Sequence, residues 1–257
     1  MDRLHRRAPD YWLYLPVIAL AALGVVMIYS ASSIVAADRY GDAAYFLKRQ
    51  LIWVGLGTLA MLLTQRIHYT AFRRFAPWLL VLAVAALALV LVPGVGRVAG
   101  GARRWIQLGG PFSFQPAEAA KLAMTLYLAN FLARSGDRLS EFRRSIVPPL
   151  VVTGLVFGLI LAQPDLGSAM LIGTVTFVML FVAGARLVHL AGLVVAGIPG
   201  LLVAILGEAY RRQRLLAFLD PWADPRGAGF HIIQSLLALG SGGLLGVGLG
   251  NSRQKFF

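Results

Sequence analysis

The residues best suited to chemistry in this sequence lie between Arg211 and Gln254. The stretch opens with three arginines in four residues, continues through Asp-Pro steps at Asp220 and Asp224, and ends in a glycine-rich run. Guanidinium groups form fork-shaped hydrogen bonds to phosphate oxygens, and a carboxylate can accept a proton from a hydroxyl. The combination predicts a site for a polyanionic substrate. Asp before Pro is also common in turns, so a purely structural role for Asp224 stays open.

A second basic and glycine-rich segment, residues 94–121, contains the run Arg103-Arg104-Trp105. Arginine forks suit phosphate oxygens, and the face of an indole suits either a sugar ring or the depth of a membrane interface. The segment therefore predicts either a second contribution to a phosphate site or an interfacial anchor whose arginines contact lipid phosphates.

Three ionisable residues lie within or between long apolar segments. Glu118 and Lys121 are three residues apart and so share one face of a helix. Asp165 stands in a tight turn, where it either caps the following helix or points into the bundle. Ionisable groups at such depth indicate a functional site or a buried structural ion pair, and the sequence leaves both open.

These residues are positioned by a largely apolar chain. Of its 257 residues, 58% are hydrophobic and only 14% are charged, which is typical of an integral membrane protein. Helices of about 20 apolar residues cross a bilayer, and the runs are too continuous for barrel strands. We therefore predict an all-α polytopic bundle with a large extracellular loop at 208–257 and a short helix near 229–239 within it. The seven predicted spans are 12–34, 49–65, 75–93, 114–133, 145–163, 167–185 and 187–207.

The charge distribution gives a moderate indication of topology. Arg3, Arg6 and Arg7 precede the first span and predict a cytoplasmic N-terminus. With these three included, the cations assigned to loops divide almost evenly between the two sides of the membrane. The net charge of +13 is therefore attributed to attraction to anionic membrane lipids and not to nucleic-acid binding. No cysteine is present, and His189 and His231 lack metal-ligand spacing, so no metal site is predicted.

Five sequence blocks resemble a known family in order and spacing. They are GARRWIQLG (101–109), QPAEAAK (115–121), QPDLGSAM (163–170), FLDPWADPRGAGFHIIQS (218–235) and GLGNSRQKFF (248–257). The chain is thereby identified as a member of the SEDS family of FtsW, RodA and SpoVE, and its ending looks more like the FtsW and SpoVE branch. Ala117 stands where the family usually has Ser. Family members have about ten spans, so we expect this chain to be a single SEDS-type domain, 1–257, that is truncated at the C-terminus.

The resemblance implies a peptidoglycan glycosyltransferase that polymerises lipid II at the outer face of the bacterial cytoplasmic membrane. It implies that Asp224 is the family's essential acidic residue, and we predict that its carboxylate acts as the general base. Asp220 is the weaker candidate for this role. Substrate and diphosphate binding is predicted for Arg103, Arg104, Trp105, Arg211, Arg212 and Arg214. Glu118, Lys121 and Asp165 would form a structural-functional polar cluster that holds the fourth and sixth spans in place.

The same resemblance implies partners and a location. We expect a class B penicillin-binding protein and other divisome proteins as partners, lipid II as substrate, and a position at the division septum. No cofactor is evident, although Mg²⁺ or another divalent cation could bridge the diphosphate. Two alternatives stay open: a lipid II flippase that uses Glu118, Lys121 and Asp165 as a carrier site, and a non-catalytic divisome scaffold that recruits the penicillin-binding protein.

Overall fold

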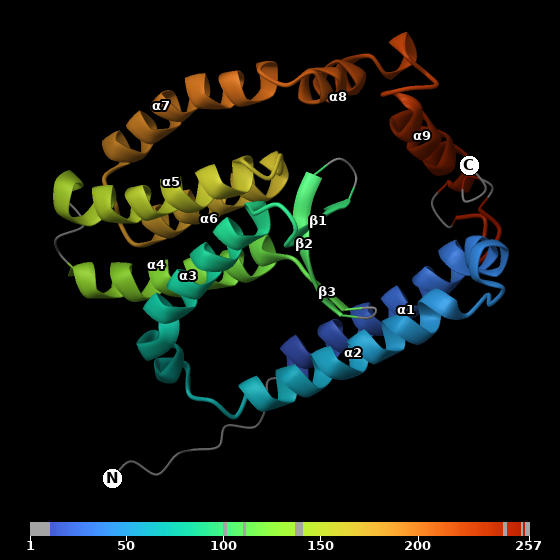
Figure 1. Cartoon of the computed structure of the whole chain (residues 1–257), viewed down its shortest axis with the longest axis horizontal. Helices are drawn as coiled ribbons and strands as arrows, with labels where there is room; N and C mark the ends of the chain where they lie inside the picture. Colours follow the sequence, from blue (N-terminus) through green and yellow to red (C-terminus); the bar gives the residue numbers. More distant parts are fainter. Residues whose placement is uncertain are drawn as a thin grey trace. The chain divides into compact units, whose positions relative to one another are not determined.

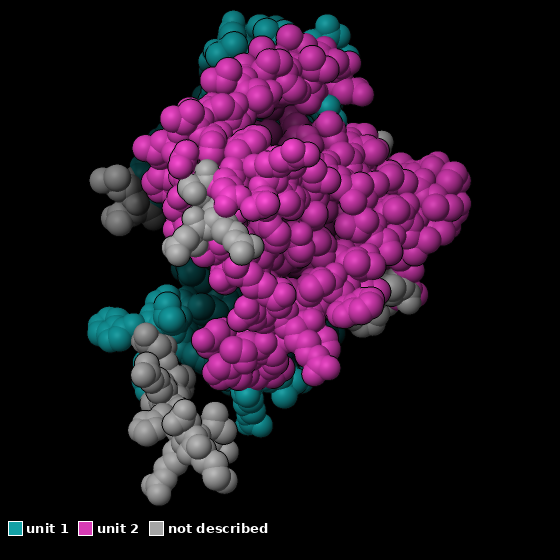
Figure 2. Space-filling model, turned by 90° about the vertical axis from the view of Figure 1, so that its left-hand side faces the viewer, with its two compact units in different colours: residues 1–66, 209–257 teal, residues 67–208 magenta. Residues whose placement is uncertain are grey.

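The computed structural model describes residues 11–99, 102–109, 112–136, 141–243, 246–252 and 254. The chain divides into two compact units, one formed by Met1–Arg66 with Ala209–Phe257 and the other by Ile67–Glu208 (Figure 2). We call them the terminal unit and the central unit, and each is described by itself.

The central unit is a helical bundle with a small sheet (Figure 1). A π-helical turn, η2 (Phe142–Ile146), leads directly into α5. The helices are α3 (Tyr69–Leu91), α4 (Pro116–Ser135), α5 (Val147–Leu161), α6 (Leu166–Val182) and α7 (Leu187–Leu206). Short turns join α5 to α6 and α6 to α7, whereas the sheet lies between α3 and α4.

The core of the central unit lies where α3, α4, α5 and α6 pack against one another, and α7 joins through α6. Leu87, Met124, Ile160 and Leu180 are among the largest fully buried side chains there. Outward-facing positions of the same helices carry exposed leucines and valines. Apolar residues on both the inner and outer faces of a helix are expected where the outer face meets lipid.

A three-stranded antiparallel sheet connects α3 to α4. Strand β1 (Gly96–Ala99) pairs with β2 (Ala102–Gly109), which pairs with β3 (Phe112–Phe114). In the β1–β2 ladder, Arg97 is opposite Trp105, and the register shifts between Arg97 and Val98. The sheet contacts α3 and α4, so it is held against one end of the central bundle.

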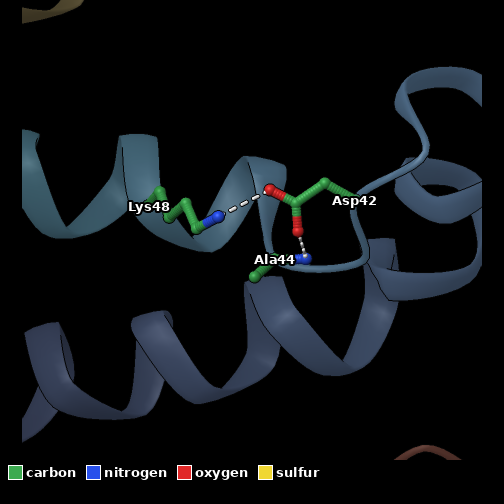
Figure 3. Close-up of polar contacts among 3 residues, drawn as sticks. All are labelled: Asp42, Ala44 and Lys48. Carbon is green, nitrogen blue, oxygen red and sulfur yellow. Dashed lines mark hydrogen bonds and ion pairs between the residues drawn. The ribbon is translucent and has the colours of Figure 1, made fainter.

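The terminal unit contains the long hairpin of α1 (Tyr11–Tyr40) and α2 (Tyr45–Thr64). Asp42 fixes the connection between these helices, accepting hydrogen bonds from the Ala44 amide at 2.9 Å and from Lys48 Nζ at 2.7 Å (Figure 3). The Lys48 ammonium, assisted by the Ala44 amide, lowers the pKa of the Asp42 carboxyl. Most side chains of α1 and α2 are exposed, as expected of helices that face lipid.

The C-terminal part of the terminal unit is mostly helical. It comprises α8 (Ala209–Leu219), the 3₁₀ turn η3 (Pro221–Ala223) and α9 (Phe230–Gly242). Helices α8 and α9 both contact η3, so the short turn joins them. Further along, the Gly250 amide donates to Ser30 Oγ of α1 at 2.8 Å.

The helical fold class predicted from the sequence is confirmed, with two additions. Helix α9 agrees with the short helix expected near 229–239, but α8 was not predicted within the loop, although Arg, Gln, Leu and Ala in that segment all favour helix. The sheet was not predicted either. Its sequence signal is the short run 102–108, which contains Trp105 and Ile106 and lies between two pairs of glycines, as is typical of a strand bounded by turns.

Helices overlap all seven of the predicted spans. Five have the length and apolar character to cross a membrane: α1, α2, α3, the continuous helix Phe142–Leu161, and α7. Helix α6 is apolar but has 17 residues, and α4 carries Glu118, Lys121 and Arg134. That α4 and α6 also span the membrane stays a prediction.

Candidate functional site

Asp224 is held in place by the backbone that follows it. Its Oδ1 accepts a hydrogen bond from the Gly227 amide and its Oδ2 accepts one from the Ala228 amide, both at 3.0 Å. Its main-chain oxygen accepts a third from Gly229, also at 3.0 Å. The residue is nevertheless exposed. Each carboxylate oxygen has two lone pairs, so both oxygens can still accept a proton or a hydrogen bond from a substrate.

Two glycines make this arrangement possible. A Cβ on Gly227 would lie 2.1 Å from Asp224 Oδ2, and a Cβ on Gly229 would lie 2.0 Å from the carbonyl oxygen of Pro221. No side chain fits at such distances. The segment Arg226-Gly227-Ala228-Gly229 therefore folds over the carboxylate only because two of its residues lack a Cβ.

Asp220 has a simpler role in the same loop. Its Oδ1 accepts a hydrogen bond from the Trp222 amide at 3.1 Å and so caps η3. This is the usual function of an aspartate before a short helical turn. Asp220 thus shapes the loop from its first residue, whereas the Asp224 carboxylate is enclosed by the backbone beyond it.

The three arginines Arg211, Arg212 and Arg214 lie on α8, in the same unit as Asp224. The Arg214 guanidinium stacks over the Tyr210 ring at 4.7 Å from its centroid. Among the described residues, no carboxylate forms an ion pair with Arg212 or Arg214. Because α8 contacts η3, which ends at the residue before Asp224, the fold brings these cations and the carboxylate into one local structure.

The two adjacent arginines of β2, Arg103 and Arg104, lie in different environments. Arg104 Nε donates to the main-chain oxygen of Gln163 at 3.1 Å, and Arg104 Nη2 donates to that of Pro164. This fork ties β2 to the turn between α5 and α6. Arg103 is exposed and Trp105 is half-buried. Arg104, predicted to bind diphosphate, is therefore already engaged by carbonyl groups of the protein.

Replacing Arg104 by alanine is expected to lower the thermal unfolding temperature of the purified protein. The change removes two hydrogen bonds from a charged donor, for which a loss of about 1.5–3 kcal/mol is typical. Arg104→Lys should restore little, because an ammonium cannot reproduce the fork. Arg103→Ala, in the adjacent exposed position, is the matched control, and equal unfolding temperatures for the two alanine variants would contradict the structural role of Arg104.

The predicted polar cluster is not joined by direct contacts in the described part of the central unit. Lys121 Nζ lies 2.7 Å from Glu118 Oε1, but both residues belong to α4. Asp165 Oδ1 accepts from the Ser168 amide at 3.1 Å and caps α6, so the capping interpretation is confirmed. No hydrogen bond or ion pair among the described residues links Asp165 to Glu118 or Lys121. Packing between α4 and α6, and not this cluster, holds the two helices together.

Gln163 is a residue that the sequence analysis did not single out. It is only 1% exposed, its Nε2 donates to the Leu87 main-chain oxygen at 3.2 Å, and its own main-chain oxygen accepts from Arg104. Its Oε1 has no hydrogen-bond partner among the described residues. Gln163 thus connects α3, the α5–α6 turn and β2. The available signal was a polar amide at the end of an apolar span, which usually has a partner inside the protein.

The predicted site residues therefore fall into two sets. Asp224 and the α8 arginines belong to the terminal unit, whereas Arg103, Arg104, Trp105, Glu118, Lys121 and Asp165 belong to the central unit. Within the described ranges, no group of three or more His, Asp or Glu side chains could hold a metal ion.

Curated relatives match almost the whole chain. Stage V sporulation protein E of Bacillus subtilis is 43% identical over 252 residues, which cover 98% of this chain and 69% of that protein. The probable peptidoglycan glycosyltransferase FtsW of Trichlorobacter lovleyi is 44% identical over 248 residues, 96% of this chain and 65% of the relative. The chain thus spans about two thirds of the length of these relatives.

Solved structures give the same result. A chain from a study of how a peptidoglycan synthase complex coordinates polymerization and crosslinking aligns with a TM-score of 0.73 and 38% identity, covering 93% of this chain and 67% of that one. The crystal structure of RodA from Thermus thermophilus aligns with a TM-score of 0.61 and 31% identity, covering 97% and 93%. The family model described as cell cycle protein, for FtsW, RodA and SpoVE, matches residues 11–257. This chain therefore belongs to the FtsW, RodA and SpoVE family and is a multi-pass helical membrane protein.

Proposed function

We propose that this protein is a peptidoglycan glycosyltransferase that polymerises lipid II into glycan strands at the outer face of the cytoplasmic membrane during cell division. The observation that carries the proposal is the match to the family over residues 11–257, with relatives named as probable peptidoglycan glycosyltransferases. The geometry of the Asp224 loop supports it, because the loop fixes an exposed carboxylate that can still accept a proton.

The proposed reaction transfers a sugar from a diphosphate to a hydroxyl. The acceptor oxygen forms a bond to the anomeric carbon while its proton passes to Asp224. The bond between the anomeric carbon and the diphosphate oxygen breaks, and its electron pair leaves on the diphosphate. General-base catalysis of this kind contributes about 10²–10⁴-fold in rate. Gly227 and Ala228 hold the carboxylate in one orientation, so no reorganisation is needed as the proton moves.

Positive charge is needed at the departing diphosphate. The proposed source is either the set of arginines on α8, in the same unit as Asp224, or the arginines of the sheet. Guanidinium groups in a partly dehydrated site become most stabilising as negative charge develops on the leaving oxygen. A divalent cation bound with the substrate would add positive charge at the leaving diphosphate. The described residues offer no set of protein ligands for such an ion, so the ion would be held by the diphosphate, and no step above depends on it.

An apolar groove of about 320 Å³ in the central unit suits the polyprenyl tail of this substrate. Its lining residues come from α3, α4 and β3: Leu79, Leu82, Ala83, Ala86, Phe114, Ala119, Leu122 and Ala123. Phe114 places one end of the groove at the sheet. A lipid chain in this groove would bring its diphosphate to the level of the sheet, where Arg103 is exposed.

The proposed setting follows from the same family membership. We propose an orientation with the N-terminus in the cytoplasm, a location at the division septum, and a complex with a class B penicillin-binding protein and other divisome proteins. The similarity to a chain of a peptidoglycan synthase complex supports the partner.

Polymerisation of fluorescent lipid II by the purified protein in detergent tests the function. We expect glycan polymer, resolved on a gel, without any bilayer present, alone or with the penicillin-binding protein added. Movement of labelled lipid II across proteoliposomes, with no polymer in detergent, would instead establish a flippase. Neither polymer nor transport in the presence of the partner would leave a scaffold as the function and contradict the proposal.

A further inference from the structure

A reciprocal pair of hydrogen bonds joins α3 to α4 near the start of α3. Arg73 Nε donates to Asn130 Oδ1 at 3.0 Å, and Asn130 Nδ2 donates to the main-chain oxygen of Arg73 at 3.3 Å. The Arg73 side chain is exposed, and its two terminal nitrogens have no partner among the described residues. Asn130 therefore holds a guanidinium group in place while leaving most of its N–H donors available.

A second cation lies beside the first. Arg134 follows Asn130 by four residues on α4, so the two share one face of the helix. It is exposed and forms no ion pair with any described residue. The carboxylate of Glu141, which follows soon after α4, is already paired with Arg144 at 3.3 Å. Within the described ranges, the charges of Arg73 and Arg134 are therefore not neutralised by the protein.

The cations mark the boundary of the apolar parts of both helices. Residues 75–91 of α3, directly after Arg73 and Arg74, carry no charge, and neither does α4 between Lys121 and Arg134. Arginines at the end of an apolar segment lie at the depth of the lipid phosphates. The proposed orientation places this end of the bundle at the cytoplasmic leaflet, which is rich in anionic lipids.

We infer that Arg73, Asn130 and Arg134 form a binding site for the phosphate of an anionic phospholipid, with Arg74 adding positive charge beside it. Guanidinium groups bind phosphate oxygens in pairs, and basic sites between membrane helices select anionic headgroups. A lipid bound here contacts α3 and α4 together and stabilises their packing. The inference goes beyond the proposed function and depends only on the membrane fold.

The effect of lipid on thermal unfolding measures this site. The full chain in an uncharged detergent is titrated with phosphatidylglycerol, and unfolding is followed by tryptophan fluorescence. A ligand that binds only the folded state raises the unfolding temperature as its concentration exceeds the dissociation constant. We expect phosphatidylglycerol to give a larger rise than phosphatidylcholine with the same acyl chains, because phosphatidylcholine has no net charge.

Two double variants with the same change in net charge separate the site from general attraction. Arg73→Gln, Arg134→Gln should need about tenfold or more phosphatidylglycerol for the same rise, since two charged donors are lost. Arg143→Gln, Arg186→Gln is the matched control. It removes exposed arginines from η2 and from the residue before α7, and it should respond as the unmutated chain does.

Asn130→Asp tests the organisation of the site without removing an arginine. The aspartate keeps an oxygen for Arg73 Nε, so the contact between α3 and α4 is retained. Its negative charge pairs with the guanidinium and repels a phosphate. We expect an unfolding temperature near that of the unmutated chain without lipid, and no rise specific to phosphatidylglycerol.

The remaining outcomes decide whether lipid is the ligand. Equal responses of the two double variants would overturn the inference, and so would equal rises with phosphatidylglycerol and phosphatidylcholine. Inorganic phosphate at matched ionic strength is the test for a free anion. A rise as large as that from phosphatidylglycerol would identify a site for soluble phosphate and refute the lipid assignment. Since no polymer is measured, the result is independent of the proposed function.

Discussion

Replacing Asp224 by alanine is expected to reduce polymerisation of lipid II by about 10²–10⁴-fold. The variant loses the proposed proton acceptor together with the two hydrogen bonds that the carboxylate receives from Gly227 and Ala228. Asp224→Asn should be impaired as well. One end of an asparagine amide is a donor, and that end would face one of two backbone N–H groups that are donors themselves.

Asp220→Asn is the control for the Asp224 variants, and rescue of Asp224→Ala by a small anion tests the mechanism. Asp220→Asn keeps an oxygen for the Trp222 amide, so we expect its polymerisation rate to stay within a few-fold of the unmutated rate. If Asp224 acts as a base, millimolar azide or formate should partly restore the rate of Asp224→Ala, because the position is exposed. An alanine variant that polymerises near the unmutated rate, with equal protein in the membrane, would refute the assignment.

Replacing Gly227 by alanine is expected to reduce the rate by about 10²-fold while leaving the fold intact. The new Cβ would lie 2.1 Å from Asp224 Oδ2 and 2.7 Å from its Cγ. The atoms in conflict belong to the end of a side chain, so the carboxylate can rotate away with little effect on the backbone. A displacement of about 1 Å in a catalytic group is sufficient for a loss of this size.

Gly229→Ala should behave differently. There the new Cβ would meet the main-chain oxygens of Pro221 at 2.0 Å and Asp224 at 2.9 Å, so the backbone itself must move. We expect lower activity together with a lower unfolding temperature. Gly240→Ala, in α9 with nothing within 4 Å of the added Cβ, is the matched control for both. If Gly227→Ala kept full activity, the orientation of the carboxylate would not matter to the reaction.

Residue type alone could not predict the role of Arg104. Two adjacent arginines beside a tryptophan indicate a phosphate site, and that pattern does not distinguish Arg103 from Arg104. Arg104 donates to the main-chain oxygens of Gln163 and Pro164, about sixty positions away in sequence, whereas Arg103 is exposed. Contacts over such separations depend on how α5 and α6 pack, and no local pattern reports them.

The capping role of Asp165 and the ion pair of Glu118 with Lys121 were accessible from the sequence, because both interactions lie within four residues. The sequence could not show whether these three residues form one cluster, because such a cluster depends on a contact between two helices. The Asp165 carboxylate instead accepts a hydrogen bond from the Ser168 amide in the first turn of its own helix.

The sequence by itself determined the helical membrane fold. Each helix satisfies its backbone hydrogen bonds internally, and the apolar character of a span depends only on the residues within it. It also indicated Asp224 as the candidate base, through a resemblance that covers the loop, and this assignment stays a prediction. Only the tertiary structure decided that the amides of Gly227 and Ala228 hold that carboxylate and that Arg104 anchors the sheet to the turn between α5 and α6. The Arg104 contacts join residues about sixty positions apart, so the packing of the whole unit selects the partners. The Asp224 contacts lie within four residues, but they depend on a loop conformation that only glycine at 227 and 229 allows.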